Sequence, residues 1–350
     1  MTYTVLALES SCDEYAGAIV RDGRDLLASV VASQASIHAR YGGVVPELAG
    51  REHLRSVVPV LETTLREAGA DWSSIDAIAV TQGPGLGGSL LVGINAAKAI
   101  AWARDIPCIP VHHIEGHLYA NWLAPALAQH NDNPPPFPLL CLVVSGGHTE
   151  LLWMTDHGHF ERLGQTRDDA AGEAFDKVGR LLGLPFPGGP AIEQEALKAE
   201  PGHGETFPRA WLPGTYDFSF SGVKTAVLNR LRPAGTTTIP TLAADQRARL
   251  ADAFQTSVVD VLATKTARAA QEFGAASVIV AGGVAANQAL RAALRERCAV
   301  PVRWPPLPLC TDNAAMIGAA AYFKRGQADP SLAFDLFSTS GPTVFSSGRR

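Results

Sequence analysis

Residues 139–154 read LLCLVVSGGHTELLWM, and this stretch decides the fold. Its first six residues are apolar, a run long enough for a buried β-strand and too short for a typical helix. The Ser-Gly-Gly-His turn at 145–148 ends that run, and residues 149–154 return to a strand-like composition. The stretch therefore predicts two β-strands joined by a glycine turn.

The start of the chain has the same outline. Residues 3–8 and 17–21 are β-like runs around a polar turn, and residues 25–33 are a third. Residues 47–68 then carry apolar side chains at helical spacing, and residues 76–81 form a short apolar run before a glycine loop. A strand meander followed by alternating helices and strands predicts a layered α/β lobe, and its recurrence predicts an internal duplication.

The chain of 350 residues is longer than one hydrophobic core usually serves, so we expect two lobes. The stretch NDNPPPFP at 131–138 is rich in proline, which precludes regular structure. We place the boundary there, with residues 1–133 as the first lobe and residues 134–311 as the second. Residues 312–333 are expected to return to the first lobe, and residues 334–350 to form a C-terminal tail.

The composition is 47% hydrophobic and 18% charged, which suits a well-buried protein and excludes a disordered chain. No apolar run approaches the roughly 18 residues of a membrane span, and the start lacks the basic and long apolar regions of a signal peptide. We therefore expect a cytoplasmic protein that contacts no membrane.

Its net charge of −5 is unfavourable for binding a polyanion unaided, so a nucleic-acid substrate would require partner proteins that supply positive surface.

His113 and His117, in the stretch HIEGH, are candidate metal ligands. Two imidazoles four residues apart lie on one face of a helix and can bind one metal ion, although such pairs are also common as structural features. Asp312, in the polar run CTDN, can add a carboxylate from a distant part of the chain. The metalloprotease motif HExxH has its general base where this chain has Ile114, so peptidase chemistry is disfavoured. The five cysteines offer no thiolate alternative, because no two have a CxxC spacing.

Two glycine turns and one acidic helix are candidates for a nucleotide site. The turn at 145–147 and the AGGVAAN stretch at 281–287 each follow an apolar strand-like run, and backbone N–H groups in such turns can face phosphate oxygens. Either turn alone is also typical of an ordinary hairpin or helix start. The helix expected near DDAAGEAFDK at 168–177 places several carboxylates, Asp176 among them, on one face, where they can accept ribose hydroxyls or simply suit a helix start.

Eight stretches, in order along almost the whole chain, resemble the bacterial tRNA N6-adenosine threonylcarbamoyltransferase family. They are ESSCDE (9–14), HIEGH (113–117), VSGGHTEL (144–151), DDAAGEAFDKVGRLLGL (168–184), FPGGP (186–190), FSFSGVKTAV (218–227), GGVAAN (282–287) and CTDNAAMIG (310–318). The resemblance implies a two-lobed actin-like, Hsp70-like and sugar-kinase-like (ASKHA) fold, with a duplicated ribonuclease-H-like core and a nucleotide cleft between the lobes. It also implies transfer of threonylcarbamoyl from threonylcarbamoyl-AMP to N6 of adenosine 37 in tRNAs that read ANN codons, with AMP as the leaving group.

Carried over position by position, the resemblance implies that His113, His117 and Asp312 bind one divalent metal ion, Fe²⁺ in the first place and Zn²⁺ as an alternative. It implies that the nucleotide contacts residues of the glycine turns and helix starts, namely Val143, Val144, Ser145, Gly146, Gly147, Asp176, Gly189, Glu193 and Asn287. Glu193 stands where the family often has Asp, and Tyr15 and Ala16 stand where it has a small polar residue and Gly. The reaction is an acyl transfer, in which a cation near the carbonyl and phosphate oxygens stabilises developing charge and no protein nucleophile is needed.

The resemblance further implies a system of several proteins. tRNA is the substrate, a metal-free paralogue (TsaB-like) pairs through the first lobe, a small ATPase (TsaE-like) is attached, and an upstream synthase supplies threonylcarbamoyl-AMP. The small-residue helix that follows the glycine stretch at 82–89 is suited either to close packing or to a partner interface. Three alternatives stay open. They are a metal-dependent peptidase, a non-enzymatic nucleotide switch of the same fold, which would use Mg²⁺ with carboxylates and not histidines, and a kinase of the same superfamily, which would need a carboxylate base for a substrate hydroxyl.

Overall fold

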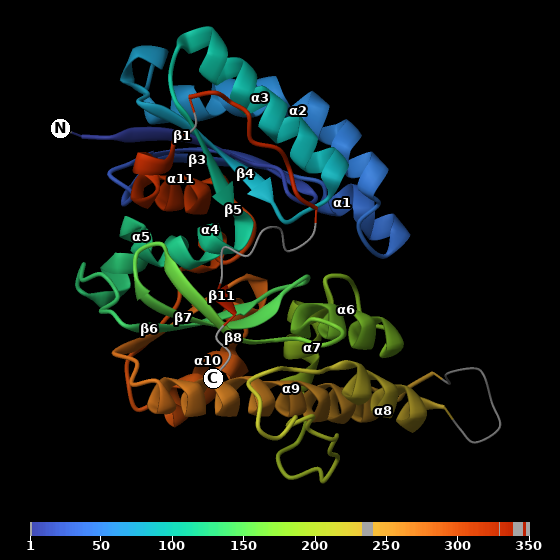
Figure 1. Cartoon of the computed structure of the whole chain (residues 1–350). Helices are drawn as coiled ribbons and strands as arrows, with labels where there is room; N and C mark the ends of the chain where they lie inside the picture. Colours follow the sequence, from blue (N-terminus) through green and yellow to red (C-terminus); the bar gives the residue numbers. More distant parts are fainter. Residues whose placement is uncertain (1, 233–240, 329, 339–345, 348–350) are drawn as a thin grey trace. The chain divides into compact units, whose positions relative to one another are not determined.

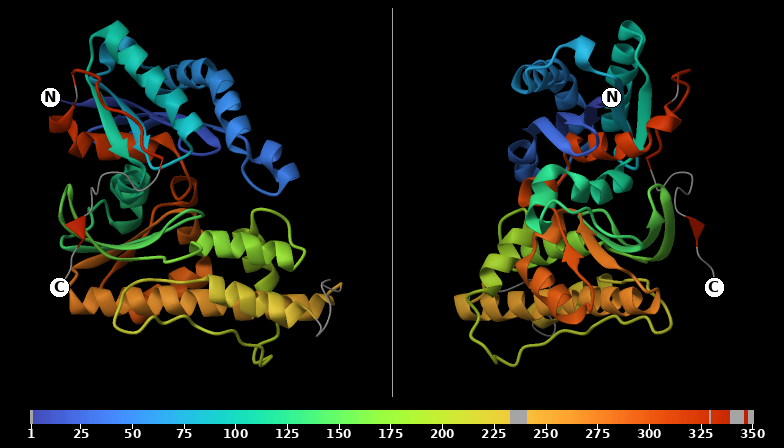
Figure 2. Two further views of the ribbon diagram at one scale, coloured as in Figure 1. Left: turned by 45° about the vertical axis from the view of Figure 1, so that its right-hand side comes forward. Right: turned by 90° about the vertical axis from the view of Figure 1, so that its left-hand side faces the viewer.

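The computed structural model describes residues 2–232, 241–328, 330–338 and 346–347. The described chain is an α/β protein of two compact units (Figures 1 and 2). One unit extends to Pro135 and also takes in His157–His159 and the chain from Trp304 to Ser346. The other takes in Pro136–Asp156 and Phe160–Arg303. The α/β class and the two-lobed organisation expected from the sequence are confirmed.

The sheet of the first unit has the order β3-β2-β1-β4-β5. Its strands are β1 (Thr4–Glu9), β2 (Glu14–Arg21), β3 (Asp25–Ser33), β4 (Ala77–Gly83) and β5 (Cys108–His112). β1, β2 and β3 form the predicted antiparallel meander, whereas β1, β4 and β5 run parallel. The parallel strands need crossover connections, and these are the helices that follow.

Helices cover both faces of this sheet. They are α1 (Ala35–His38), α2 (Pro46–Ala68), α3 (Gly87–Arg104), α4 (His113–Tyr119), α5 (Ala124–Leu127) and α11 (Ala314–Phe323). Leu6 and Leu8 of β1 belong to the apolar core with side chains of α2 and α3. On the opposite face, a Cβ built on Gly318 of α11 would lie 3.3 Å from the Cβ of Ala7. Alternation along β1 therefore sends successive side chains to opposite faces of the sheet, toward different helices.

The sheet of the second unit has the order β10-β9-β6-β7-β8-β11. Its strands are β6 (Leu139–Val144), β7 (Thr149–Asp156), β8 (His159–Gln165), β9 (Ser277–Ala281), β10 (Val302–Arg303) and β11 (Ser346–Ser347). β6 pairs antiparallel with β7 and parallel with β9, as β1 does with β2 and β4. The duplication expected from residues 139–154 and the start of the chain is confirmed in this shared strand pattern.

Five helices complete the second unit: α6 (Ala171–Leu181), α7 (Gly188–Ala196), α8 (Ser221–Leu231), α9 (Ala244–Glu272) and α10 (Gln288–Arg297). α9 is the long helix below the second sheet in Figure 1, and Phe254 on it packs edge-to-face on Phe175 of α6, with ring centroids 5.2 Å apart. Among the helices of the described residues, none combines the length and the apolar composition that a bilayer span requires.

The described beginning of the C-terminal tail lies against the first unit. Leu332, Phe334 and Leu336 pack on the core formed by α2, α3 and the sheet. Lys98 of α3 donates a hydrogen bond of 2.5 Å to the Phe334 carbonyl and lies over the Phe334 ring. Alternating apolar residues therefore hold this segment in place. Residues 339–345 and 348–350 of the tail lie outside the described part.

Candidate metal centre and glycine turns

α4 begins directly after β5, so His113 and His117 are presented from the end of the edge strand that pairs with β4. The side chain of His112 accepts a hydrogen bond from the Ile114 N–H and thereby caps the helix. The rings of His113 and His117 are buried, with centroids 4.7 Å apart and planes at 79°. Two imidazoles therefore face one small volume from one helix face, as the spacing predicts.

Asp312 joins the two histidines because α4 and α11 cross closely. A Cβ built on Gly116 would lie 2.6 Å from the Ile317 side chain, so only glycine permits this approach without repacking. Asp312 lies two residues before the start of α11, and its Oδ1 lies 3.2 Å from Nε2 of His117 and 3.6 Å from Nε2 of His113. The ligand atoms of the three residues lie within 4.8 Å of one another, which suits one bound cation.

The surroundings of His117 fit a metal ligand. Its ring is 1% exposed, and neither ring nitrogen has a hydrogen-bond partner among the described residues. The nearby Asp312 oxygen is at ion-pair distance from Nε2 but does not meet hydrogen-bond geometry. A buried imidazole without partners carries a desolvation cost that a bound cation would offset. The donor set of two imidazoles and one carboxylate fits a divalent metal ion.

Glu9 orients His113. Its Oε2 lies 3.1 Å from His113 Nδ1, and its Oε1 accepts the Ser11 N–H at 2.5 Å. A carboxylate can only accept here, so Nδ1 carries the proton and Nε2 is left to face Asp312. Burial opposes charge on the ring, but Glu9 and Asp312 raise the pKa of His113 to about 9. The resulting negative field attracts a cation, which would have to displace any proton from Nε2.

Sequence reasoning missed the role of Glu9. Glu9 belongs to the ESSCDE stretch, but a strand-end carboxylate has no local signal for a contact with a histidine 104 residues away. Glu115, in contrast, is close in sequence and faces elsewhere. Its Oε2 accepts from Lys324 Nζ at 2.7 Å, and the Glu115 carboxylate is buried in that ion pair. A metalloprotease base must reach a metal-bound water, so the peptidase alternative has no support in this geometry.

The two predicted glycine turns lie side by side in the second unit. β6 and β9 are parallel neighbours in register Val143↔Ala281, so their carboxyl ends meet at one edge of the sheet. Gly282 has φ +91°, and a Cβ there would lie 2.5 Å from the Val144 carbonyl. A turn in which Ser145 N–H donates to the His148 carbonyl follows β6. Ligands of α/β sheets commonly bind at the carboxyl ends of strands.

The acidic helix starts against the same edge. A Cβ on Gly172 of α6 would lie 2.6 Å from the Ser145 carbonyl, so the helix backbone contacts the turn directly. Asp176, one turn further along, accepts the Gly188 N–H at 2.7 Å and so joins α6 to the start of α7. Burial raises the pKa of the Asp176 carboxyl. A Cβ on Gly189 would meet no atom within 4 Å, so open space lies beside it.

Glu193 and Asn287 have structural partners. Glu193 Oε1 accepts the Gln288 N–H at 2.6 Å, at the start of α10. Asn287 caps the same helix by accepting the Leu290 N–H, and its Nδ2 donates to Gln255 at 2.8 Å. Glu193 therefore bonds from α7 to the start of α10, and Asn287 caps that helix directly after the second glycine turn. All nine predicted nucleotide contacts belong to this unit.

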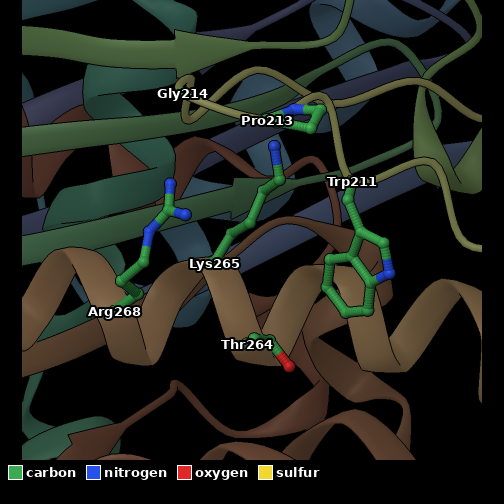
Figure 3. Close-up of a pocket in the computed structure, with 6 residues that line it drawn as sticks. All are labelled: Trp211, Pro213, Gly214, Thr264, Lys265 and Arg268. Atoms are coloured by element: carbon green, nitrogen blue, oxygen red, sulfur yellow. The ribbon is translucent and has the colours of Figure 1, made fainter.

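A pocket of about 270 Å³ lies elsewhere in the second unit (Figure 3). None of the predicted site residues lines it; its lining is Trp211, Pro213, Gly214, Thr264, Lys265 and Arg268. Lys265 donates to the carbonyls of Thr215 and Asp217, at 3.2 and 2.5 Å, and Arg268 donates to that of Thr215. Burial, and then the charge of Arg268, lower the pKa of Lys265 to about 8. These cations hold a loop on α9, a structural role.

Comparison with known proteins relates the whole chain to one family. A profile of the family described as tRNA N6-adenosine threonylcarbamoyltransferase (TsaD) matches residues 25–319. The chain is 58% identical to the protein of that name from Thermomicrobium roseum, over 91% of each chain. It is 53% identical to the one from Bacillus subtilis, over 92% of this chain and 91% of the relative.

Two solved structures share the fold at low sequence identity. HypF of T. kodakarensis superimposes with a TM-score of 0.60 at 13% identity, over 94% of this chain and 49% of that chain. The activator of the 2-hydroxyisocaproyl-CoA dehydratase from Clostridium difficile does so with a TM-score of 0.51 at 14% identity, over 93% and 97%. These likenesses concern the fold alone.

Proposed function

Because the chain belongs to the tRNA N6-adenosine threonylcarbamoyltransferase family, we propose that His113, His117 and Asp312 hold the divalent metal ion on which its acyl transfer depends. The enzyme transfers threonylcarbamoyl from threonylcarbamoyl-AMP to N6 of adenosine 37 in tRNA and releases AMP. The observation that carries the proposal is the buried ring of His117, which has no hydrogen-bond partner in the described chain and lies 3.2 Å from the Asp312 carboxylate.

We assign Fe²⁺ as the metal. Two imidazoles and one carboxylate, with the remaining positions open, form a donor set typical of non-haem iron, and Zn²⁺ is the alternative. When bound, such a cation supplies Lewis-acid stabilisation to carbonyl and phosphate oxygens. Glu9 holds the His113 ring with Nε2 toward Asp312, and burial of both histidines excludes water from the ligand side.

The substrate nucleotide is proposed to bind at the carboxyl edge of the second sheet. The residues assigned to it are Val143, Val144, Ser145, Gly146, Gly147, Asp176, Gly189, Glu193 and Asn287. Cβ atoms built on Gly146, Gly147 and Gly189 would meet nothing within 4 Å, so a ligand can approach the backbone at these positions. Asp176 accepts the Gly188 N–H and also has a backbone hydrogen bond with Gly189, whereas Glu193 accepts the Gln288 N–H. The remaining lone pairs of the two carboxylates are suited to ribose hydroxyls.

The partner surface is proposed to lie on α2 and α3. Leu54 and Val58 of α2 are 67% and 59% exposed, and Leu91 of α3 is 49% exposed. The two helices approach closely where a Cβ on Gly50 would lie 3.3 Å from the Gly88 carbonyl. Exposed aliphatic side chains on neighbouring helices suit a metal-free paralogue of the same fold. A small ATPase and a synthase that makes threonylcarbamoyl-AMP complete the proposed system, which we place in the cytoplasm.

The test is incorporation of labelled threonine into unmodified tRNA by this protein, its proposed partners and the synthase. Protein stripped with a chelator is expected to lose incorporation, and Fe²⁺ is expected to restore it more fully than Zn²⁺ or Mg²⁺. Full incorporation by protein shown to be metal-free would overturn the metal assignment. Restoration by Zn²⁺ alone would overturn the choice of iron and leave the ligand set standing.

A further inference from the structure

A cluster of buried, hydrogen-bonded polar side chains lies in the first unit, near the proposed metal centre. Gln34 precedes α1, His38 lies on α1 and His53 lies on α2. All three are buried, at 3%, 0% and 0% exposed. Buried amides and imidazoles are costly unless each polar atom has a partner, so this cluster must be satisfied internally.

The hydrogen bonds of this cluster run in one direction. The Val45 N–H can only donate, and it lies 3.3 Å from His38 Nδ1, which must therefore accept. His38 Nε2 then carries the proton and donates to Gln34 Oε1 at 3.1 Å. The Gln34 amide nitrogen lies 3.2 Å from the Ala49 carbonyl, which can only accept, so the orientation of the amide is determined.

The series of hydrogen bonds from His38 through Gln34 and His53 ends on the loop between β1 and β2. Gln34 Nε2 also donates to His53 Nδ1 at 2.8 Å, which leaves the His53 proton on Nε2. His53 Nε2–H donates to the Cys12 carbonyl at 3.0 Å. The Gln34 backbone N–H adds a bond of 3.2 Å to the Asp13 carbonyl. Two successive carbonyls of the loop are therefore held by this cluster.

The same loop carries the groups that contact His113. Ser11, next to Cys12, donates its N–H to Glu9 Oε1 and places its Oγ 3.2 Å from His113 Nδ1. Tyr15, which departs from the family pattern, packs on the His53 ring with centroids 5.5 Å apart. If the Cys12 carbonyl lost its donor, the loop would have to shift to satisfy it, and Ser11 would shift with it.

We propose that Gln34, His38 and His53 are positioning residues for the metal centre. Through the Cys12 carbonyl they hold the loop in the place where Ser11 and Glu9 orient His113. The inference rests on the proposed metal site. Residues that hold a metal ligand typically contribute 10- to 100-fold to metal affinity. Gln34, His38 and His53 act one step further from the metal, so we expect loss of their hydrogen bonds to weaken metal binding by about 3- to 10-fold.

The test uses Co²⁺, whose visible spectrum reports ligand geometry, and competition with a chelator for its Kd. His53→Leu keeps the bulk of the ring and removes both bonds. This variant should raise the Kd for Co²⁺ and alter the Co²⁺ absorption bands. In His53→Gln the amide can accept from Gln34 and donate to the Cys12 carbonyl, so the Kd and the bands should return to those of the unmutated protein. Gln34→Met, measured in the same way, serves if His53→Leu does not fold.

Thr64→Val is the matched control. It removes a buried hydrogen bond of 2.7 Å on the same helix, from the Thr64 hydroxyl to the Val60 carbonyl, and should leave the Co²⁺ spectrum and Kd unchanged. An unchanged spectrum and Kd in His53→Leu, or equal changes in the control, would overturn the positioning role. Failure of the unmutated protein to bind Co²⁺ would instead reject the metal site itself.

Discussion

The two histidines of α4 differ in what they contact. His113 has the Glu9 carboxylate at Nδ1, whereas His117 has no hydrogen-bond partner in the residues described. Removing His113 would take from the buried Glu9 carboxylate its imidazole partner and leave only the Ser11 N–H and the Thr81 hydroxyl, which destabilises the fold. Removing His117 leaves no such group behind. His117 is therefore the cleaner position at which to separate metal binding from folding.

His117→Leu should abolish metal binding while the protein stays folded. Leucine fills a similar volume, and exchanging an unpartnered polar ring for an apolar group is close to neutral for stability. We expect threonylcarbamoyl transfer to fall by at least about 100-fold, since a direct ligand matters more than the groups that orient it. Metal content and initial rates measure this, with His159→Leu at an exposed histidine as the control. Retained metal stoichiometry in His117→Leu would count against the ligand role.

Glu9→Gln should weaken metal binding without unfolding the protein. The two Glu9 oxygens accept from Ser11, Thr81 and His113, and an amide has only one accepting oxygen. Either the Ser11 N–H loses its acceptor or the His113 proton moves to Nε2, where it blocks the metal. The Kd for Co²⁺ should rise about 10- to 100-fold. Glu14→Gln, whose carboxylate accepts from Ser33 instead, is the comparison, and equal Kd values in both variants would contradict this role.

Among the secondary-structure elements, some helix N-termini are capped by side chains that are distant in sequence. α8 begins at Ser221 without a side-chain cap of its own. Asp168, 52 residues earlier than Phe220, accepts the N–H groups of Phe220 and Ser221 at 2.7 and 3.2 Å. Its other oxygen accepts the hydroxyls of Ser219 and Ser221. Burial acts against the charge, but these hydrogen bonds lower the pKa of the Asp168 carboxyl.

Asp168→Ala should cost about 1 kcal/mol of stability near neutral pH, as loss of a helix cap does. The pKa of the Asp168 carboxyl is lower in the folded than in the unfolded state. Its contribution to stability is therefore fully present above the unfolded-state pKa of about 4 and is lost as the pH falls through the folded-state pKa. The free energies of unfolding of the two proteins should therefore converge below pH 4. Urea titrations between pH 7 and pH 3 measure this, and a gap that widens toward acid would refute it.

For the molecule as a whole, the net charge and the exposed apolar side chains of α2 bear on how the protein would bind tRNA and its proposed partner. The net charge of −5 disfavours unaided binding of tRNA, while Leu54 and Val58 expose apolar area on α2. His53, which directly precedes Leu54 in sequence, is buried and belongs to the hydrogen-bonded cluster of Gln34, His38 and His53. One helix thus carries both the proposed partner surface and a contact to the metal-side loop.

If the proposed complex with a metal-free paralogue forms through α2, the double variant Leu54→Asp, Val58→Asp should lose it. Two charges in an apolar interface would be desolvated without partners, so we expect the Kd of the complex to rise at least about 100-fold. The free protein should keep its melting temperature and its Co²⁺ Kd, because both side chains are exposed. Glu47→Ala and Glu62→Ala on the same helix are controls. Unchanged assembly on a sizing column would place the partner elsewhere.

Local sequence patterns predicted several of the strands and helices and the histidine pair of the proposed metal centre. Short apolar runs followed by glycine-containing turns predicted β6 and β9, and the strand meander predicted β1 to β3. The eight stretches in order identified the family, which the comparisons confirm. These signals are local, because apolar periodicity and turn chemistry are properties of a few neighbouring residues. His113 and His117 were recognisable for the same reason, since both lie within one short helix.

Only the tertiary structure decided which distant groups meet. The contact of Glu9 with His113 depends on the neighbouring positions of β1, β4 and β5 in the sheet, and that of Asp312 with His117 on the α4–α11 crossing at Gly116. The chain from His38 to the Cys12 carbonyl and the packing of Phe334 on α3 are of the same kind. Such contacts join residues tens to hundreds of positions apart. Strand order and helix packing select them, and no local pattern in the sequence specifies either.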